Sequence, residues 1–241
     1  ELIDALPADG LAVVNDDFEK CADRKVDNVE CVRYAVSNVT DAVRFTAKDV
    51  AYSPTGTTFT VVDRKSGSEL KLHTRLVGEC NISNLIAATI VALHLGVDPH
   101  KIAYAVEHID QVEHRLNVKR IPGGLTIIDD AYNSNPAGSR MAMDVLRQID
   151  GGQKIVITPG MIELGDEQEA LNERLGVYIA TAADIAIIVG KYNRDALTRG
   201  IASVEGGVCR IETVDTFAEA QQLLATISAP GDVVLYENDL P

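Results

Sequence analysis

The sequence has no apolar run that approaches the length of about 20 residues needed for a membrane-spanning helix. Its acidic start, Glu1-Leu2-Ile3-Asp4, is unlike a signal peptide. Basic residues are also scarce: 22 lysines and arginines stand against 36 aspartates and glutamates, for a formal net charge of -14. No basic patch is evident, so an anionic ligand must be held by local donors. We therefore expect a cytoplasmic protein with no membrane insertion and no nucleic-acid partner.

Cysteine patterns typical of metal sites are absent as well. Cys21, Cys31, Cys80 and Cys209 follow no CxxC or other metal-ligand spacing. We expect reduced structural thiols, as in most cytosolic proteins. The sequence contains no low-complexity tract and no internal repeat beyond an alternation of strands and helices.

With 241 residues, 46% of them hydrophobic, the chain can form two medium-sized domains. Helical periodicity stops in the connection that runs from Val112 to Leu116. The turn Pro122-Gly123-Gly124 then precedes the next strand. We therefore predict two domains, spanning residues 1–119 and 120–241.

The second half alternates apolar strand-like runs with helical patterns, which predicts an α/β domain with a mainly parallel sheet. The spacing predicts strands at 125–128, 154–158, 184–189, 208–214 and 232–236, and helices at 136–149, 166–182, 193–203 and 216–227. Asp166 and Glu169 fit a capping box, and we interpret Asn193 and Asp215 as helix caps too.

The first half is more mixed. It predicts strands at 11–14, 43–46, 58–62 and 69–72, turns at 53–56 and 65–67, and helices at 84–95 and 99–109. This pattern indicates a β meander with two helices and no central sheet of its own. We therefore expect the end of a domain rather than a whole one.

The segment Asp129-Asp130-Ala131-Tyr132-Asn133-Ser134-Asn135-Pro136 places two carboxylates and two carboxamides between a strand and a helix start. Asn135 can cap a helix whose first residue is Pro136. Free N–H groups at such a start favour anions, and the carboxylates could hold a cation. Ligands bind at these strand ends in open α/β sheets. The alternative is an acidic turn with a capping asparagine.

Further polar residues follow the other predicted strands: Thr158 to Glu163, Lys191 and Asn193, and Glu237 to Asp239. In the loop from Thr158 to Gly165, Gly160 would permit a positive φ or a close backbone approach. Glu163 is either a ligand-facing carboxylate or a solvated loop residue.

Two other positions could contact a nucleotide. Asn81 and Asn84 lie one turn apart at the start of an alanine-rich helix, where a carboxamide can read an adenine edge. The alternative is N-capping by Asn81 or Ser83. Arg115, in the connection, could reach a phosphate with its forked donors, or it could be a surface residue.

In this order, Gly78-x-x-Asn81-x-x-Asn84, His114-Arg115, the segment 129–136 and Gly160-Met161-x-Glu163-Leu164-Gly165 resemble the Mur ligase family. The resemblance covers most of the chain and is strongest to members that join D-alanyl-D-alanine to a UDP-N-acetylmuramoyl-peptide. It implies an ATP-dependent amide ligase of peptidoglycan synthesis. In this family ATP converts a carboxylate into an acyl phosphate, which the incoming amine then attacks.

The resemblance also implies a fold and site residues. Residues 1–119 would end a central ATP-binding domain, and residues 120–241 would form a C-terminal Rossmann-like domain. Nucleotide and amine would meet where the two domains close on each other. The implied ATP-binding residues are Asn81, Asn84, Arg115, Asp130 and Tyr132, and the implied substrate-binding residues are Asn133, Asn135 and Glu163. The cofactors would be ATP and Mg²⁺, with no metal ligand or catalytic residue assigned in this chain.

The sequence departs from the family pattern in several places. The family's phosphate-binding loop, GxxGK followed by Ser or Thr, does not occur in these 241 residues. The start, residues 1–7, resembles the stretch that follows the family's carbamylated lysine. Cys80 stands where many relatives have histidine, Thr158-Pro159 replaces a more usual Gly-Asp pair, and residues 237–241 lack the Gly-Ser-Arg type of ending. We therefore expect a fragment that catalyses nothing by itself.

Other hypotheses remain open. The same scaffold could use a different amine, or it could be the ligase-like subunit of a muropeptide amidating complex. The chain could also be a non-catalytic α/β binding module. A flavodoxin-like phosphoacceptor domain would use Asp129 and Asp130 as a Mg²⁺ pair, but it would need an aspartate and a lysine where the sequence has Lys191 and Glu237.

Overall fold

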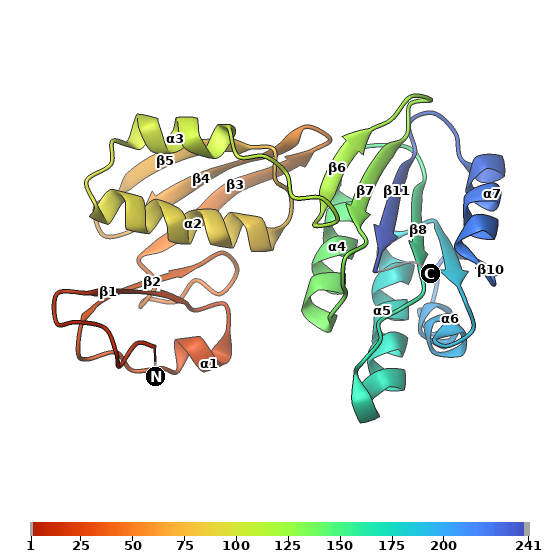
Figure 1. Cartoon of the computed structure of the whole chain (residues 1–241), viewed down its shortest axis with the longest axis horizontal. Coiled ribbons are helices and arrows are strands. Elements are labelled where there is room, and N and C mark those ends of the chain that lie inside the picture. The colour runs from red at the N-terminus through yellow and green to blue at the C-terminus, as the bar shows by residue number, and fades with distance from the viewer. Residues whose placement is uncertain (1, 239–241) are drawn as a thin grey trace. The chain divides into compact units, whose positions relative to one another are not determined.

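The computed structural model describes residues 2–238, so the predicted polar position Asp239 lies outside the described residues. The chain divides into two compact units, shown in Figure 1. The first comprises Glu1–Ala51 and Gly56–Asp110, and the second comprises Tyr52–Thr55 and Gln111–Pro241. Among the described residues, no helix combines the length and apolar character required to cross a bilayer.

The described part of the first unit contains a five-stranded sheet in the order β1-β2-β3-β4-β5. The strands are β1 (Leu11–Asn15), β2 (Glu30–Ala35), β3 (Phe45–Ser53), β4 (Gly56–Asp63) and β5 (Ser68–Thr74). β2 pairs in parallel with both β1 and β3, and β4 and β5 form an antiparallel hairpin. The helices are α1 (Glu19–Ala22), α2 (Glu79–His94) and α3 (Pro99–Glu107).

The prediction that this part lacks its own central sheet is wrong, because β2 had not been predicted. Val32 and Tyr34 are buried in this strand, but a charged residue lies between them. The guanidinium of that residue, Arg33, reaches the buried carboxylate of Asp16 at 2.6 Å. The alternation of apolar and polar residues was therefore present in the sequence, but the ion pair that compensates the charge of Asp16 was not.

The described part of the second unit contains a six-stranded sheet in the order β10-β9-β8-β11-β7-β6. The strands are β6 (Asn117–Arg120), β7 (Thr126–Asp130), β8 (Lys154–Thr158), β9 (Ile185–Val189), β10 (Arg210–Val214) and β11 (Val233–Glu237). Of these described strands, only β6 is antiparallel to its neighbour, so the predicted mainly parallel α/β sheet is confirmed. β6 had not been predicted, and it spans the position of the predicted domain boundary.

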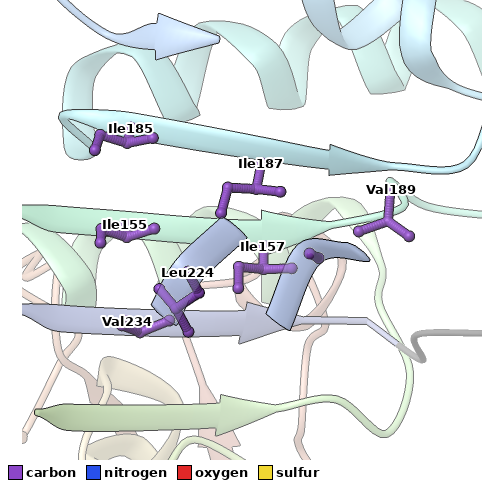
Figure 2. Close-up of a cluster of buried hydrophobic side chains, with 8 residues drawn as sticks. Ile155, Ile157, Ile185, Ile187, Val189, Leu224 and Val234 are labelled. Carbon is purple, nitrogen blue, oxygen red and sulfur yellow. The ribbon is translucent and has the colours of Figure 1, made fainter. Parts of the chain in front are cut away.

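The connecting helices are α4 (Pro136–Gln148), α5 (Gln168–Ala182), α6 (Arg194–Ala202) and α7 (Phe217–Ile227). From β7 through β8 and β9 to β10 the chain proceeds towards one edge of the sheet, and it then returns to the middle for β11. Right-handed crossovers therefore place α4, α5 and α6 on one face of the sheet and α7 on the other. Figure 2 shows Leu224 of α7 packed against buried side chains of the central strands. These are Ile155, Ile157, Ile185, Ile187 and Val234.

The capping box is in a different place from the predicted one. A short 3₁₀ turn over Gly165–Glu167 precedes α5, which has no side-chain cap, so the capping box predicted at Asp166 and Glu169 is wrong. A capping box is present instead at the start of α7. There the Thr216 hydroxyl accepts a hydrogen bond from the Glu219 N–H at 3.2 Å.

Two glycines allow α5 and α6 to pack closely. A Cβ atom on Gly200 would lie 1.9 Å from the carbonyl oxygen of Glu173, and one on Gly176 would lie 2.4 Å from that of Leu197. Both obstacles are backbone atoms, which cannot rotate away as a side chain would. The close contact of the two helices therefore depends on glycine at both positions.

We predict that Gly200→Ala destabilises the protein by about 1–3 kcal/mol, because the new methyl group overlaps backbone atoms. In an open helix the same change stabilises by roughly 0.5–1 kcal/mol. Chemical denaturation gives the free energy of unfolding, with Thr198→Ala on the same helix as the control. A more stable Gly200→Ala variant would contradict this packing.

Candidate functional site

The candidate site in the second unit lies at the carboxyl ends of β7, β8 and β11. The parallel register of β11 and β7 places Glu237 beside Asp130. Thr158 ends β8, and its hydroxyl donates a hydrogen bond to Glu237 at 2.9 Å. Three strands that are distant in sequence therefore deliver polar side chains to one edge of the sheet, where ligands bind in this class of fold.

The predicted helix start after β7 is confirmed. Asn135 is the N-cap of α4, and its side-chain oxygen accepts from the N–H groups of Ala137 and Gly138 at 3.1 and 2.9 Å. Pro136 occupies the first turn. Asn133 and Tyr132, just before the cap, are exposed. The carboxamide oxygen of Asn135 is thus used for capping, whereas the side chains of Asn133 and Tyr132 face solvent.

The two aspartates of the segment turn to different partners, because successive side chains on a strand point to opposite faces of the sheet. Asp129 contacts His114 Nδ1 at 3.0 Å and Lys119 Nζ at 3.9 Å. Asp130 accepts a hydrogen bond from the Leu116 N–H at 3.0 Å. Burial raises the pKa of Asp130 to about 6.

This arrangement does not fit a metal ion held by the protein alone. Asp129 and Asp130 do not converge on a shared position, and within residues 2–238 no group of three His, Cys, Asp or Glu side chains could hold a metal. Mg²⁺ usually takes one or two carboxylates together with water and substrate phosphates.

Arg115 lies against the ring of Tyr132. Its guanidinium carbon is 4.4 Å from the ring centroid, which is cation–π geometry. The residues on either side, His114 and Leu116, both have positive φ angles of 58° and 49°. Such backbone is unfavourable for residues other than glycine and is characteristic of functional loops. The structure thus brings together Arg115, Tyr132 and Asp130, three of the predicted ATP-binding residues.

A cavity of about 630 Å³ opens on the α7 face of the same sheet edge. Its polar lining includes His114, Lys119 and Asp129, and its apolar lining includes Tyr132 and Tyr236. This combination of aromatic walls and a few charged groups is typical of small-molecule sites.

The loop after β8 has the backbone conformation that its glycines indicate. Gly160 has a φ of 81°, and a Cβ atom there would lie 2.5 Å from Asn172 Oδ1, which confirms the predicted positive φ and close approach. The Met161 N–H donates to Asn172 Oδ1 at 2.8 Å. Glu163 is exposed with a φ of 62°. Buried hydrogen bonds therefore anchor the loop and leave Glu163 at its surface.

Asn193 occupies the N-cap position of α6, as predicted, but its side chain makes no cap hydrogen bond to this helix. Asn193 is buried, and its amide nitrogen donates to the carbonyls of Pro159 and Met161, each at 2.9 Å. Gln168 donates to its oxygen at 2.8 Å. Asn193 therefore fixes the loop after β8, a role that depends on contacts about 30 residues away in sequence.

Asp215 does not act as a helix cap either. Its carboxylate pairs with Arg194 at 2.8 Å and with Lys191 at 3.3 Å, and these cations lower its pKa. Thr216 caps α7 instead.

In the first unit, the predicted adenine-reading residues lie in the first turns of α2. The N-cap is Gly78, with a φ of 95° and no side-chain cap, so N-capping by Asn81 or Ser83 is wrong. Asn81 donates its amide N–H to the Val77 carbonyl at 2.7 Å, whereas Asn84 is exposed. A carboxamide offers both a donor and an acceptor, so the exposed Asn84 fits the edge of an adenine ring.

The sequence interpretation missed the role of Glu237, which it treated only as part of a polar strand end. Its carboxyl group is buried and contacts the hydroxyls of Ser134, Ser139 and Thr158. A possible signal was an acidic residue directly after the apolar strand residues 233–236.

We predict that Asp130→Asn flattens the dependence of stability on pH. The folded pKa of about 6 exceeds the ordinary 3.8, so the stability that the Asp130 proton contributes is fully present below about pH 4. This contribution is lost as the pH rises through 6. The loss is at most about 3 kcal/mol. Denaturant unfolding from pH 4 to pH 7 measures it, and the exposed-site variant Asp144→Asn should keep the wild-type slope. Parallel wild-type and Asp130→Asn curves would refute the assignment.

We predict that Asn193→Asp costs about 3 kcal/mol or more, because a carboxylate cannot donate to the two carbonyls and would be buried beside them. A capping asparagine would tolerate aspartate. Asn135→Asp, at a true N-cap, is the matched control and should change the free energy of unfolding by less than about 0.5 kcal/mol. Equal effects of the two substitutions in denaturation experiments would argue against the bridging role.

Comparison with known proteins gives one family. Residues 114–236 match the family model "Mur ligase, glutamate ligase domain", and residues 1–92 match "Mur ligase middle domain". The UDP-N-acetylmuramoyl-tripeptide–D-alanyl-D-alanine ligase of Bacillus subtilis is 27% identical, over 79% of this chain and 41% of that protein. The enzyme of the same name from Mycobacterium tuberculosis H37Rv is 29% identical, over 98% of this chain and 49% of that protein.

Two solved structures have the same fold. A crystal structure of MurF from Acinetobacter baumannii matches with a TM-score of 0.77 and 22% identity, over 99% of this chain and 50% of that chain. The structure of MurF ligase from Thermotoga maritima in complex with ADP matches with a TM-score of 0.77 and 20% identity, over 96% of this chain and 50% of that chain. The chain thus spans half or less of the length of these relatives.

Proposed function

Because the chain belongs to the Mur ligase family, we propose that it supplies part of the active site of an ATP-dependent amide ligase of peptidoglycan synthesis. The full gene product would join D-alanyl-D-alanine to a UDP-N-acetylmuramoyl-tripeptide through an acyl phosphate. The names of the curated relatives support this choice of substrates. The structural observation that carries the proposal is the grouping of Arg115, Tyr132 and Asp130 beside the N-terminus of α4.

The two units would have different tasks. The first would be the end of a central ATP-binding domain and the second a C-terminal ligase domain, as the separate family-model matches support. In the first, Asn84 would read the adenine edge, and Asn81 would support it through the remaining carboxamide oxygen. No GxxGK sequence lies in these residues, so no residue of this chain is proposed for the phosphate-binding loop.

In the second unit, the proposed role of Arg115 is to neutralise phosphate charge. Its five N–H donors form a fork that suits a phosphoryl group, and Tyr132 holds the guanidinium in place. The partial positive charge at the N-terminus of α4 acts in the same direction. ATP, when bound, supplies the phosphoryl group that activates the carboxylate. Positioned donors then stabilise the negative charge that develops during the attack of the amine.

The exposed side chains of this edge are proposed to contact the incoming amine substrate. They are Asn133 and Glu163, together with the amide nitrogen of Asn135. Glu163 could pair with the ammonium group of a dipeptide before that ammonium group loses a proton and becomes the attacking amine. Mg²⁺ would accompany the nucleotide phosphates. Since ATP and UDP-linked precursors are cytoplasmic metabolites, the proposed reaction belongs in the cytoplasm.

ATP-dependent phosphate release by the full gene product tests the proposal. UDP-N-acetylmuramoyl-tripeptide and D-alanyl-D-alanine are each supplied or omitted, and the 241-residue chain alone serves as a control. We expect release only when both substrates are present. Release with another amine and not with D-alanyl-D-alanine would keep the ligase and overturn its substrate, and no release with any amine would overturn the reaction.

We predict that Arg115→Ala lowers kcat/KM on the order of 100-fold or more, the usual consequence of removing a donor to a developing anion. Arg147→Ala removes another exposed arginine, at the far end of α4, and should leave the rate within about two-fold. Steady-state phosphate release measures both variants. A rate for Arg115→Ala equal to that of the control would show that the guanidinium does not act on the reacting phosphate.

A further inference from the structure

Glu237 is a fully buried carboxyl group at the end of the central strand β11, with 1% of its surface exposed. One carboxyl oxygen contacts the hydroxyl of Ser134 and, at 2.7 Å, that of Ser139. The other oxygen accepts from the Thr158 hydroxyl at 2.9 Å. Its hydrogen-bond partners in the described residues are therefore hydroxyl groups alone, from the turn before α4, from α4 itself and from the end of β8.

The number of protons in this cluster favours a protonated carboxyl group. Ser134 and Ser139 also approach each other, with 2.5 Å between their oxygens, and the Ser139 hydroxyl lies 3.0 Å from the carbonyl of Asn135. Four contacts join these groups: Glu237 to each serine, the two serines to each other, and Ser139 to the carbonyl of Asn135. An ionised Glu237 leaves only the two serine protons for them. A neutral Glu237 adds a third proton, which completes a continuous chain of donors from Glu237 through the two serines to Asn135 and leaves only the Glu237–Ser139 contact without a proton.

The charges around Glu237 lead to the same conclusion. Within residues 2–238 no lysine, arginine or histidine forms a recorded ion pair with it, and the charged group beside it on β7 is the carboxyl of Asp130. The neighbouring groups of β8 and α4 are neutral hydroxyls. Burial raises the pKa of Glu237, although the three hydroxyls partly oppose this. An unpaired buried carboxylate would cost several kcal/mol, so the group keeps its proton instead.

This carboxyl group connects the two segments proposed to meet the substrates. Ser134 and Ser139 belong to the start of α4, and Thr158 begins the loop in which the Gly160 N–H donates to the Thr158 hydroxyl at 2.9 Å. The next residue, Asn238, continues the connection by donating its side-chain amide to the Gly160 carbonyl at 2.6 Å. The end of β11 therefore touches both segments at once.

We propose that Glu237 is a positioning residue that stays protonated in the folded protein and, through Ser134, Ser139 and Thr158, holds the segment 129–136 and the loop 158–165 in one arrangement. It touches no reacting atom. Its effect on catalysis rests on the proposed function, whereas its protonation and its structural coupling do not.

Infrared spectroscopy of the purified chain at pH 7 tests the protonation. We expect a C=O stretching band of a buried carboxylic acid that disappears in Glu237→Gln and persists in the exposed-site control Glu163→Gln. Asp130→Asn should leave this band in place as well, which shows that the band comes from Glu237 and not from the neighbouring carboxyl group of Asp130. If the band is missing from the wild type, or unchanged in Glu237→Gln, the proposal is overturned.

The pH dependence of unfolding gives a second readout. A folded pKa above the ordinary 4.5 means that the proton-linked stability is fully present below that pH and is lost as the pH rises through the folded pKa. Glu237→Gln cannot lose a proton. As the pH rises above 4.5, the denaturation midpoint of the wild type should therefore fall relative to that of this variant. A constant difference between the two midpoints would contradict a retained proton.

Activity of the full gene product separates positioning from a purely structural role. Glu237→Gln, which keeps a neutral donor, should retain the wild-type kcat, whereas Glu237→Ala should lower kcat on the order of 100-fold with the substrate KM nearly unchanged. Equal activity of the Ala and Gln variants would overturn the positioning role. If the wild type itself releases no phosphate, the proposed reaction fails, and the infrared and unfolding results still decide whether Glu237 holds its proton.

Discussion

The parallel register of β7, β11 and β8 is the constraint on which the candidate site depends. It sets Glu237 beside Asp130 and brings Thr158 within hydrogen-bond distance, although these residues are separated by up to 107 positions in sequence. The register is fixed in turn by the apolar core beneath α7, because a slip of one residue would turn every buried isoleucine of the central strands towards the other face. The packing of the sheet interior thus determines the chemistry of its edge.

Strand alternation then sorts the polar groups of this edge between two faces. Asp129 faces the cavity with His114 and Lys119, where a cation and an imidazole lie close to its charge. Asp130 and Glu237 face the helices on the other side, where burial favours their neutral forms. Adjacent acidic residues in the sequence therefore have different electrostatic environments, which a doublet of aspartates cannot reveal by itself.

Much of the second unit could be predicted from the sequence because its strands are short apolar runs and its helices have local start signals. The cap at Asn135 and the positive φ of Gly160 are of this kind. The roles of Asn193 and Glu237 could not be predicted, because their partners come from distant segments. In each case a local rule gave a plausible answer, a cap or a polar strand end, and tertiary contacts determined the actual one.

The first unit shows a different limit. β2 was not predicted, although Arg33 alternates with the buried Val32 and Tyr34 as in a half-buried strand. What the sequence could not show is the ion pair through which Arg33 compensates the buried charge of Asp16. The hairpin of β4 and β5 was predictable from its turns and alternating residues. Of the eight predicted site residues, the structure brings together Arg115, Asp130 and Tyr132. Which substrate each of the eight residues binds remains a proposal.

Hydrogen–deuterium exchange of the full gene product tests most directly whether this sheet edge is the functional site. It would be measured with and without UDP-N-acetylmuramoyl-tripeptide, D-alanyl-D-alanine and ADP. The account predicts that ligands slow exchange in residues 129–139 and 158–165, the two segments joined by Glu237. Protection confined to other segments, with exchange in these two unchanged, would contradict it.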